Sequence, residues 1–150
     1  MLKLLLVSLG LTGMTVLMHG VGTLYSFLHI AAIWNKKSYS LMAISVELLV
    51  TRLVVYLLLL HLTEAAVWAA FYYIGNLLET FETAMYFSLT SYATLGYGDV
   101  ILSGQWRLLG PIEAMVGVLM MGWSTGIIVA VILRAYAHRL NMNVKEPNKF

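Results

Sequence analysis

Three long apolar stretches dominate this chain of 150 residues and leave little sequence for anything else. They occupy residues 2–34, 41–75 and 108–134. A helix needs about 20 mostly apolar residues to cross a hydrocarbon layer about 30 Å thick, so each stretch is long enough to span a bilayer. The chain is 61% hydrophobic and only 11% charged, which argues against a soluble domain. We therefore expect an all-α membrane protein with three transmembrane helices.

The few cationic side chains predict how these helices are oriented. Lys36 and Lys37 lie between the first two stretches, and Arg134 ends the third. Because lysine and arginine accumulate on the cytoplasmic side, we expect the N-terminus outside and the C-terminus in the cytoplasm. Aromatic residues near the end of the second stretch fit the outer interfacial belt, namely Trp68, Tyr72 and Tyr73. Alternatively, the N-terminal apolar run could begin a signal peptide, although no clear cleavage site follows it.

A segment too short to cross the membrane separates the second and third stretches. Residues 79–93 can form a short helix with Glu79 or Thr80 as its N-cap and Glu82 in its first turn. Residues 94–99 follow, with the sequence Thr-Leu-Gly-Tyr-Gly-Asp. Non-helical backbone at membrane depth is tolerated only where protein buries it or it lines a watery cavity. We therefore expect a re-entrant helix that leads into a loop.

This loop contains the residues needed to direct backbone carbonyls toward one axis. Gly96 and Gly98 can adopt positive φ angles, which a residue with a Cβ adopts only with strain. Alternate carbonyls can then replace the hydration shell of a monovalent cation. Thr94 can add a hydroxyl at the inner end, and Asp99 can raise the cation concentration at the mouth.

Residues 91–99, Ser-Tyr-Ala-Thr-Leu-Gly-Tyr-Gly-Asp, resemble the pore signature of potassium channels, usually T-V-G-Y-G-D or T-I-G-Y-G-D. Leu95 departs from it at a side chain that faces away from the ion. The run from Phe81 to Asp99 is similar to the pore helix and filter of bacterial channels with a two-helix pore. The resemblance implies a pore domain at 41–135, with an outer helix at 41–75, a pore helix at 79–93, a filter at 94–99 and an inner helix at 108–134. An extra transmembrane helix at 1–40 and a short cytoplasmic tail at 136–150 would flank this domain.

The resemblance also assigns residues to the transport of K⁺. The carbonyls expected to coordinate K⁺ are those of Thr94, Leu95, Gly96 and Tyr97. Gly98 and Asp99 would set the geometry and the mouth of the filter. One copy of the motif supplies one wall, so a homotetramer is implied. No cofactor is expected besides K⁺ as the transported ion.

Four further residues are candidates for supporting or gating the filter. Tyr86 and Phe87 occupy the place of an aromatic pair that braces the filter from behind, although core packing explains Phe87 equally well. Glu113 could bond filter-supporting groups or complement the start of the inner helix. Gly122 lies where the family has a hinge, although glycines in membrane helices also allow close packing.

Charged side chains inside the apolar stretches require partners or water. In the second stretch, those that need an explanation are Glu47, Arg52, His61 and Glu64. His61 and Glu64 lie three residues apart on one helix face and could bond each other. Tyr56, one turn after Arg52, could be the partner of that arginine. A voltage sensor needs several regularly spaced arginines, so strong voltage sensing is disfavoured.

Composition narrows the remaining functions. The absence of cysteine excludes disulfides and thiolate metal sites, and a net charge of +2 gives no reason to expect nucleic acid. Membrane lipid is the expected partner besides other copies of the chain, in a bacterial inner (plasma) membrane. Enzymatic activity using His61 and Glu64 is disfavoured because no H-E-x-x-H or G-x-S-x-G pattern accompanies them. A weakly selective cation channel and a non-conducting partner subunit stay open, as does pH regulation through His19, His29 or His61.

Overall fold

The computed structural model describes residues 1–35 and 46–145, which fold into helices and short loops. In these ranges the α-helices are α1 (Leu2–Asn35), α2 (Val46–Ile74), α3 (Phe81–Tyr92) and α4 (Leu109–Lys145), and a 3₁₀ turn, η2 (Gly104–Trp106), precedes α4. Three segments are long and apolar enough to cross a membrane: Leu2–Ala32, Val46–Ile74 and Gly104–Ala137. The prediction of an all-α membrane fold with three spanning helices is confirmed.

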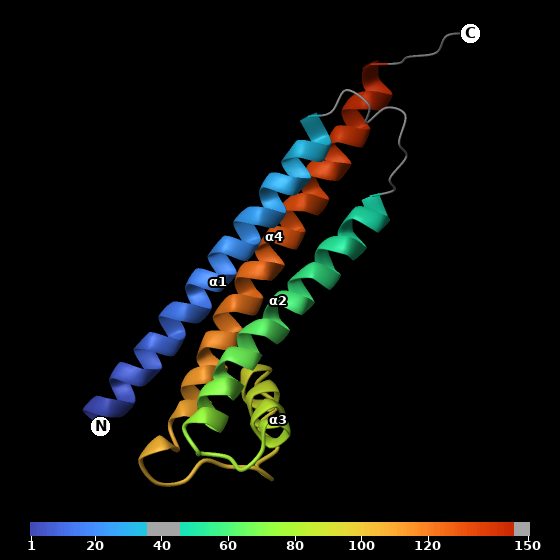
Figure 1. Ribbon diagram of the computed structural model, residues 1–150. Helices are drawn as coiled ribbons and strands as arrows, with labels where there is room; N and C mark the ends of the chain where they lie inside the picture. The colour runs from blue at the N-terminus through green and yellow to red at the C-terminus, as the bar shows by residue number, and fades with distance from the viewer. Residues whose placement is uncertain (36–45, 146–150) are drawn as a thin grey trace.

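The three long helices form one bundle, and α3 lies at one end of it beside α2 and α4 (Figure 1). With 12 residues, α3 is too short to cross the hydrocarbon layer. The N-terminus of α1 lies at the same end of the bundle as α3 (Figure 1). Next to it, the Lys3 ammonium sits 5.7 Å from the centre of the Trp106 ring. The C-terminal part of α4 lies at the opposite end (Figure 1).

The helix α1 packs through a polar stripe and presents leucines to its surroundings. The buried polar side chains along this stripe are Ser8, Thr15, His19, Thr23 and Ser26. Most of their hydroxyls donate to carbonyls of the preceding turn, as Thr23 does to His19 at 2.8 Å. The exposed side chains include Leu5, Leu6, Leu9, Leu17, Leu24 and Leu28. Such a pattern suits a helix in lipid, where small and polar residues hold helices together.

Two aromatic side chains near the end of α2 belong to the buried core. Trp68 and Tyr72 are both 0% exposed. The indole of Trp68 donates a hydrogen bond of 2.9 Å to Thr15 Oγ1 of α1, and the ring of Tyr72 packs edge-on against Phe87 of α3. The prediction that Trp68 and Tyr72 face the lipid interface is therefore wrong, because α1 and α3 cover them. Only Tyr73 of this group is exposed.

The observed ends of α2 and α4 differ from the expected ranges. The helix α2 begins at Val46, and residues 41–45 lie outside the described residues. The helix α4 continues beyond Arg134 through Lys145, into the region expected to be a short tail. Nothing between Arg134 and Lys145 is a helix breaker, since glycine and proline are absent from that stretch.

Candidate functional site

The site begins with the capped N-terminus of α3. Thr80 has extended backbone angles, and its side chain accepts a hydrogen bond of 3.1 Å from the amide of Thr83. Glu82 lies in the first turn, where a carboxylate complements the positive end of the helix dipole. The expectation of a cap at Thr80 is confirmed. The cap fixes where α3 starts, and the helix ends at Tyr92.

The carbonyl of Thr90, in the last turn of α3, organises the loop that follows. The amides of Leu95 and Gly96 both donate to this carbonyl, at 2.8 and 3.1 Å. The amide of Thr94 donates to the carbonyl of Ser91 at 2.9 Å. The loop therefore turns tightly at the C-terminal end of α3, where the helix dipole is negative.

Within residues 94–99, positive φ angles occur at the two glycines that the sequence predicts and also at Thr94. Gly96 has φ 53° and Gly98 has φ 79°, which glycine adopts without steric cost. Thr94 has φ 60°, a conformation that is strained for a β-branched residue. The three hydrogen bonds to the last turn of α3 hold it there.

A hydrogen bond joins α3 to the end of the loop. The hydroxyl of Tyr86 donates to Asp99 Oδ2 at 2.6 Å. This bond lowers the pKa of the Asp99 carboxyl from its ordinary value and raises the pKa of the Tyr86 phenol. Asp99 is thus held as a carboxylate at the mouth of the loop. Tyr86 contacts the loop, as expected for a supporting residue.

Phe87 supports the loop region through packing alone. Its side chain is buried, and its ring centre lies 5.2 Å from that of Tyr72 in an edge-on arrangement. A Cβ at Gly110 would lie 3.0 Å from the Phe87 ring, so α4 approaches α3 closely here. Phe87 therefore packs where α3 meets α2 and α4.

Glu113 is fully buried and connects three helices. The hydroxyl of Tyr72 in α2 donates to Glu113 Oε2 at 2.7 Å. A hydrogen bond also joins Ser88 in α3 to Glu113 Oε1. The sequence suggested that Glu113 bonds groups that support the loop or complements the start of its own helix. Its hydrogen bond to Ser88 of α3, the helix that precedes the loop, matches the first of these roles. The sequence reasoning missed Tyr72 and Ser88, although a phenol inside an apolar stretch signals a need for a hydrogen-bond partner.

Gly117 and Gly122 of α4, of which Gly122 is the predicted hinge, have different surroundings. A Cβ at Gly117 would clash with the carbonyl of Tyr92, the last residue of α3. A Cβ at Gly122 would meet nothing within 4 Å, and α4 is continuous through this position. Gly117 therefore serves close packing. The hinge role of Gly122 stays a prediction.

A hollow of about 350 Å³ lies between the loop and the start of α4. Its lining includes Thr94, Gly96, Gly98, Arg107 and Pro111. Leu95 and Tyr97 are 56% and 67% exposed, although both are large and apolar or aromatic. The loop of one chain thus has open space around it and uncovered side chains.

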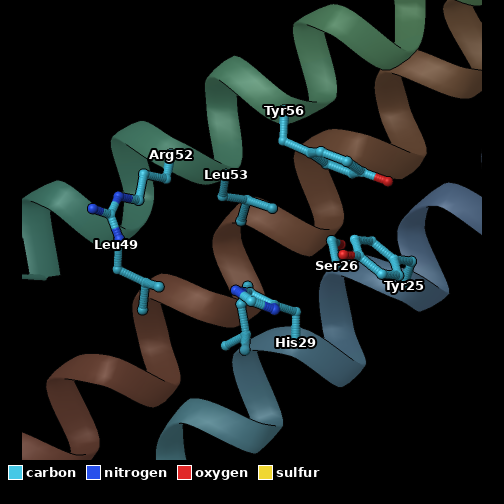
Figure 2. A pocket seen from close by; sticks show the side chains of 8 residues that line it. Tyr25, Ser26, His29, Leu49, Arg52, Leu53 and Tyr56 are labelled. Carbon is cyan, nitrogen blue, oxygen red and sulfur yellow. The ribbon is translucent and has the colours of Figure 1, made fainter.

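One further charged residue of the spans, Arg52, is not among the residues that line this hollow. Arg52 lines a cavity of about 240 Å³ between α1 and α2, together with His29, Tyr25 and Tyr56 (Figure 2). Tyr56, considered as a partner for Arg52, donates its hydroxyl to the carbonyl of Gly22 at 2.9 Å.

Comparison with known proteins gives one match. The model of a protein family described as ion channel matches residues 43–134. The matched region contains α2, α3, the loop and most of α4, and it leaves α1 outside. No curated protein and no solved structure matches the chain.

Proposed function

Because this chain belongs to the ion channel family, we propose that it is a potassium channel that conducts K⁺ passively through residues 94–99. The observation that supports this proposal is the backbone of the loop. Positive φ angles at Gly96 and Gly98 occur within a Thr-Leu-Gly-Tyr-Gly-Asp sequence that directly follows α3. Backbone carbonyls arranged in this way can replace the water around a dehydrated K⁺ ion.

The loop would work with the helix that carries it. The carbonyls of Thr94, Leu95, Gly96 and Tyr97 coordinate K⁺ in consecutive sites, and repulsion between neighbouring ions keeps the throughput high. The negative end of the α3 dipole favours a cation beside the loop. The Asp99 carboxylate attracts cations to the mouth.

Four copies of the chain form the pore. One chain supplies one wall of the ion path, and closed cyclic symmetry around that path supplies the rest. The exposed Leu95, Tyr97 and Ile101 support this assembly. They lie outside the spanning segments, so neighbouring chains are better placed than lipid tails to cover them. Other copies of the chain and membrane lipid are its partners, and neither a cofactor nor nucleic acid is required.

The proposed setting is a bacterial plasma membrane, with the loop and the N-terminus outside and the C-terminus in the cytoplasm. Lys36 and Lys37, together with the cations from Arg134 to the C-terminus, support this orientation through the positive-inside rule. The end of the bundle that carries α3 would then face outward.

A weakly selective monovalent cation channel is the second candidate. Two features of the loop favour it: Leu95 in place of the usual valine or isoleucine, and the strained φ of Thr94. Both could change how rigidly the carbonyls are held. The selectivity of a filter depends on the number and arrangement of these carbonyls.

Flux measurements separate the candidates. The purified protein is reconstituted in liposomes, and its K⁺ flux is compared with its Na⁺ flux. Gly96→Ala is the matched variant, because alanine is strained at the φ of 53° that Gly96 adopts. K⁺ flux well above Na⁺ flux, lost in the variant, supports the potassium channel. Equal fluxes favour the weakly selective channel. A lack of flux across a range of voltage and pH contradicts both and favours a non-conducting partner subunit.

A further inference from the structure

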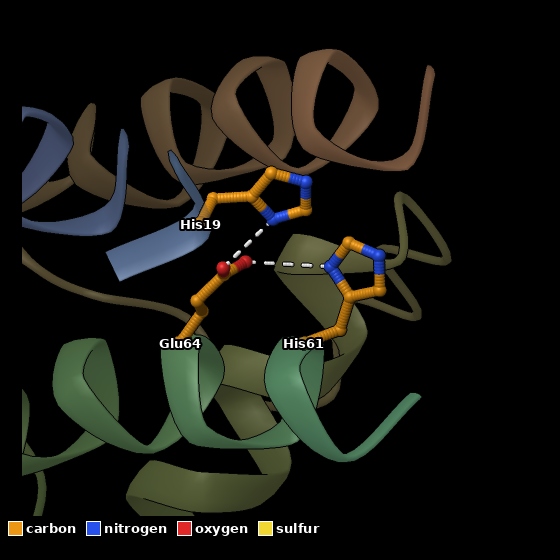
Figure 3. A group of neighbouring side chains, drawn as sticks. All are labelled: His19, His61 and Glu64. Atoms are coloured by element: carbon orange, nitrogen blue, oxygen red, sulfur yellow. Dashed lines mark hydrogen bonds and ion pairs between the residues drawn. The ribbon is translucent and has the colours of Figure 1, made fainter. Parts of the chain in front are cut away.

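A cluster of two histidines and a glutamate lies where the spanning helices meet the end of α3. His19 comes from α1, and His61 and Glu64 come from α2; we call these three residues the His–Glu cluster (Figure 3). The side chains of His19 and Glu64 are 0% exposed and that of His61 is 15% exposed. Buried charged groups are rare inside membranes and indicate a function or a strong partner.

The two imidazole rings face the same carboxyl group. His19 Nδ1 lies 2.9 Å from Glu64 Oε1, and His61 Nδ1 lies 3.3 Å from Glu64 Oε2. One ligand atom from each of the three residues lies within 4.8 Å of the other two. The predicted pairing of His61 with Glu64 is confirmed. The contact of His19 with Glu64 was not predicted, because His19 lies on another helix and is 45 residues away in the sequence.

Hydroxyl groups surround the cluster on its other sides. Tyr92, the last residue of α3, hydrogen-bonds to Glu64 Oε2. The Ser124 hydroxyl of α4 lies 3.0 Å from His61 Nε2 and 3.4 Å from His19 Nε2. Every helix of the bundle therefore contributes a polar group.

Hydrogen-bond counting limits the arrangements open to this cluster when Glu64 is ionised. A carboxylate only accepts hydrogen bonds, so hydrogens on both Nδ1 atoms would face Glu64. In neutral rings both Nε2 atoms would then be acceptors, and the single hydroxyl hydrogen of Ser124 satisfies only one of them. A positive charge shared by the cluster, from a proton or a metal ion, removes this conflict. A neutral Glu64 carboxyl that donates to Tyr92, with Tyr92 donating to His61 Nδ1, avoids the conflict without an added charge.

We propose that the His–Glu cluster binds a divalent transition metal ion of the zinc class through His19 Nδ1, His61 Nδ1 and a Glu64 carboxylate oxygen. Imidazole nitrogen and carboxylate oxygen are common zinc ligands. Ligands at about 2.0–2.1 Å in a tetrahedron lie about 3.3 Å from one another. The observed separations of 2.9 and 3.3 Å, which are measured to the two different oxygens of Glu64, are close to this value. The three ligand atoms lie within 4.8 Å of one another, so they would have to move closer together around a metal ion.

Metal binding resolves the hydrogen-bond conflict at Ser124. With Nδ1 bound to the metal, each ring carries its hydrogen on Nε2. Both Nε2 atoms can then donate to the Ser124 oxygen, which has two lone pairs. Tyr92 orients the carboxylate through its hydrogen bond to Glu64 Oε2, and its hydroxyl lies 3.1 Å from His61 Nδ1. Such supporting partners are typical of metal sites.

The site would tie α1 to the channel region. His19 lies outside the segment that matches the ion channel family, and the other ligands lie inside it. Tyr92 is two residues before Thr94, so the metal would also restrain the end of α3 and the loop. This inference does not depend on which ion the channel conducts.

Zinc binding by the full-length protein tests the proposal. The chain is purified without a histidine tag, treated with a chelator, and titrated with zinc sulfate in detergent by calorimetry and elemental analysis. We expect one zinc ion per chain and an X-ray absorption spectrum with imidazole ligands. His19→Ala and His61→Ala should abolish this binding. Ser124→Ala, which keeps all ligands, should weaken it about 10–100-fold.

His29→Ala is the matched control, because His29 lies on α1 but lines the separate cavity beside Arg52. It should bind zinc as the wild type does. Wild-type protein without stoichiometric zinc would overturn the proposal and favour a cluster balanced by an extra proton. Equal loss of binding in His29→Ala and His19→Ala, with both proteins folded, would overturn it as well.

Discussion

The hydroxyl of Tyr72 donates a hydrogen bond of 2.7 Å to Glu113 Oε2, and both side chains are completely buried. This contact links α2 to α4 at the level of α3. Glu113 is also bonded to Ser88 of α3, so the carboxyl group holds together the helices that position the loop. Removing one partner from such a network leaves a buried polar atom without its hydrogen bond.

Tyr72→Phe should therefore destabilise the protein by about 1–3 kcal/mol. The ring and its packing against Phe87 remain, but Glu113 loses a donor. Thermal unfolding in detergent measures the effect. Tyr73→Phe is the control, because Tyr73 is exposed and should change stability little. Equal unfolding temperatures for Tyr72→Phe and the wild type would contradict this role.

Tyr86→Phe should change the pH dependence of the loop. The Tyr86 hydroxyl holds the pKa of Asp99 below its ordinary value. The ionised Asp99 carboxylate stabilises the folded loop by accepting the hydrogen bond from Tyr86. This stabilisation is fully present above the ordinary carboxyl pKa, and it is lost only as the pH falls through the lowered pKa of Asp99. The variant should lose it at a higher pH. A titration of the Asp99 carboxyl by NMR checks this, and identical midpoints in both proteins would refute it.

Alanine at Gly117 and alanine at Gly122 of α4 should have opposite consequences. Gly117→Ala forces a methyl group into the carbonyl of Tyr92 and should cost about 1–3 kcal/mol through overpacking. Gly122→Ala meets no atom within 4 Å and should leave the fold stable or raise its stability by up to about 1 kcal/mol. Thermal unfolding of both variants tests the contrast.

The hinge prediction for Gly122 adds a second readout. If α4 bends at Gly122 during opening, Gly122→Ala should lower K⁺ flux while the unfolding temperature stays at or above that of the wild type. Unchanged flux in this variant would argue that opening does not use Gly122.

Thr80→Ala should weaken the start of α3. The Thr80 side chain accepts from the Thr83 amide at 3.1 Å, and loss of such a cap costs about 1 kcal/mol. Thr80→Asn keeps a capping side chain and should restore most of the stability. If both variants unfold at the same lower temperature, the cap is not the cause.

Local patterns allowed much of the fold to be predicted. The spanning helices follow from length and hydropathy, and the start of α3 follows from the cap at Thr80. The positive φ angles at Gly96 and Gly98 follow from the absence of a Cβ. Each of these features depends on residues that are near one another in the sequence.

Contacts between distant segments were harder to predict. The burial of Trp68 depends on Thr15 of α1, 53 residues away, and the pairing of His19 with Glu64 depends on how α1 rotates against α2. The partners of Glu113 come from two other helices. The apolar pattern of one helix does not reveal which neighbour covers each face, so these polar contacts became visible only in the folded structure.

The reversal potential under K⁺ on one side of a planar bilayer and Na⁺ on the other tests the central claim most directly. The account predicts a strong shift toward the K⁺ equilibrium potential. It predicts the same shift for Leu95→Val, because the proposed pore has this side chain facing away from the ion path. A reversal potential near zero would mean that the residues 94–99 do not select K⁺, and would contradict the account.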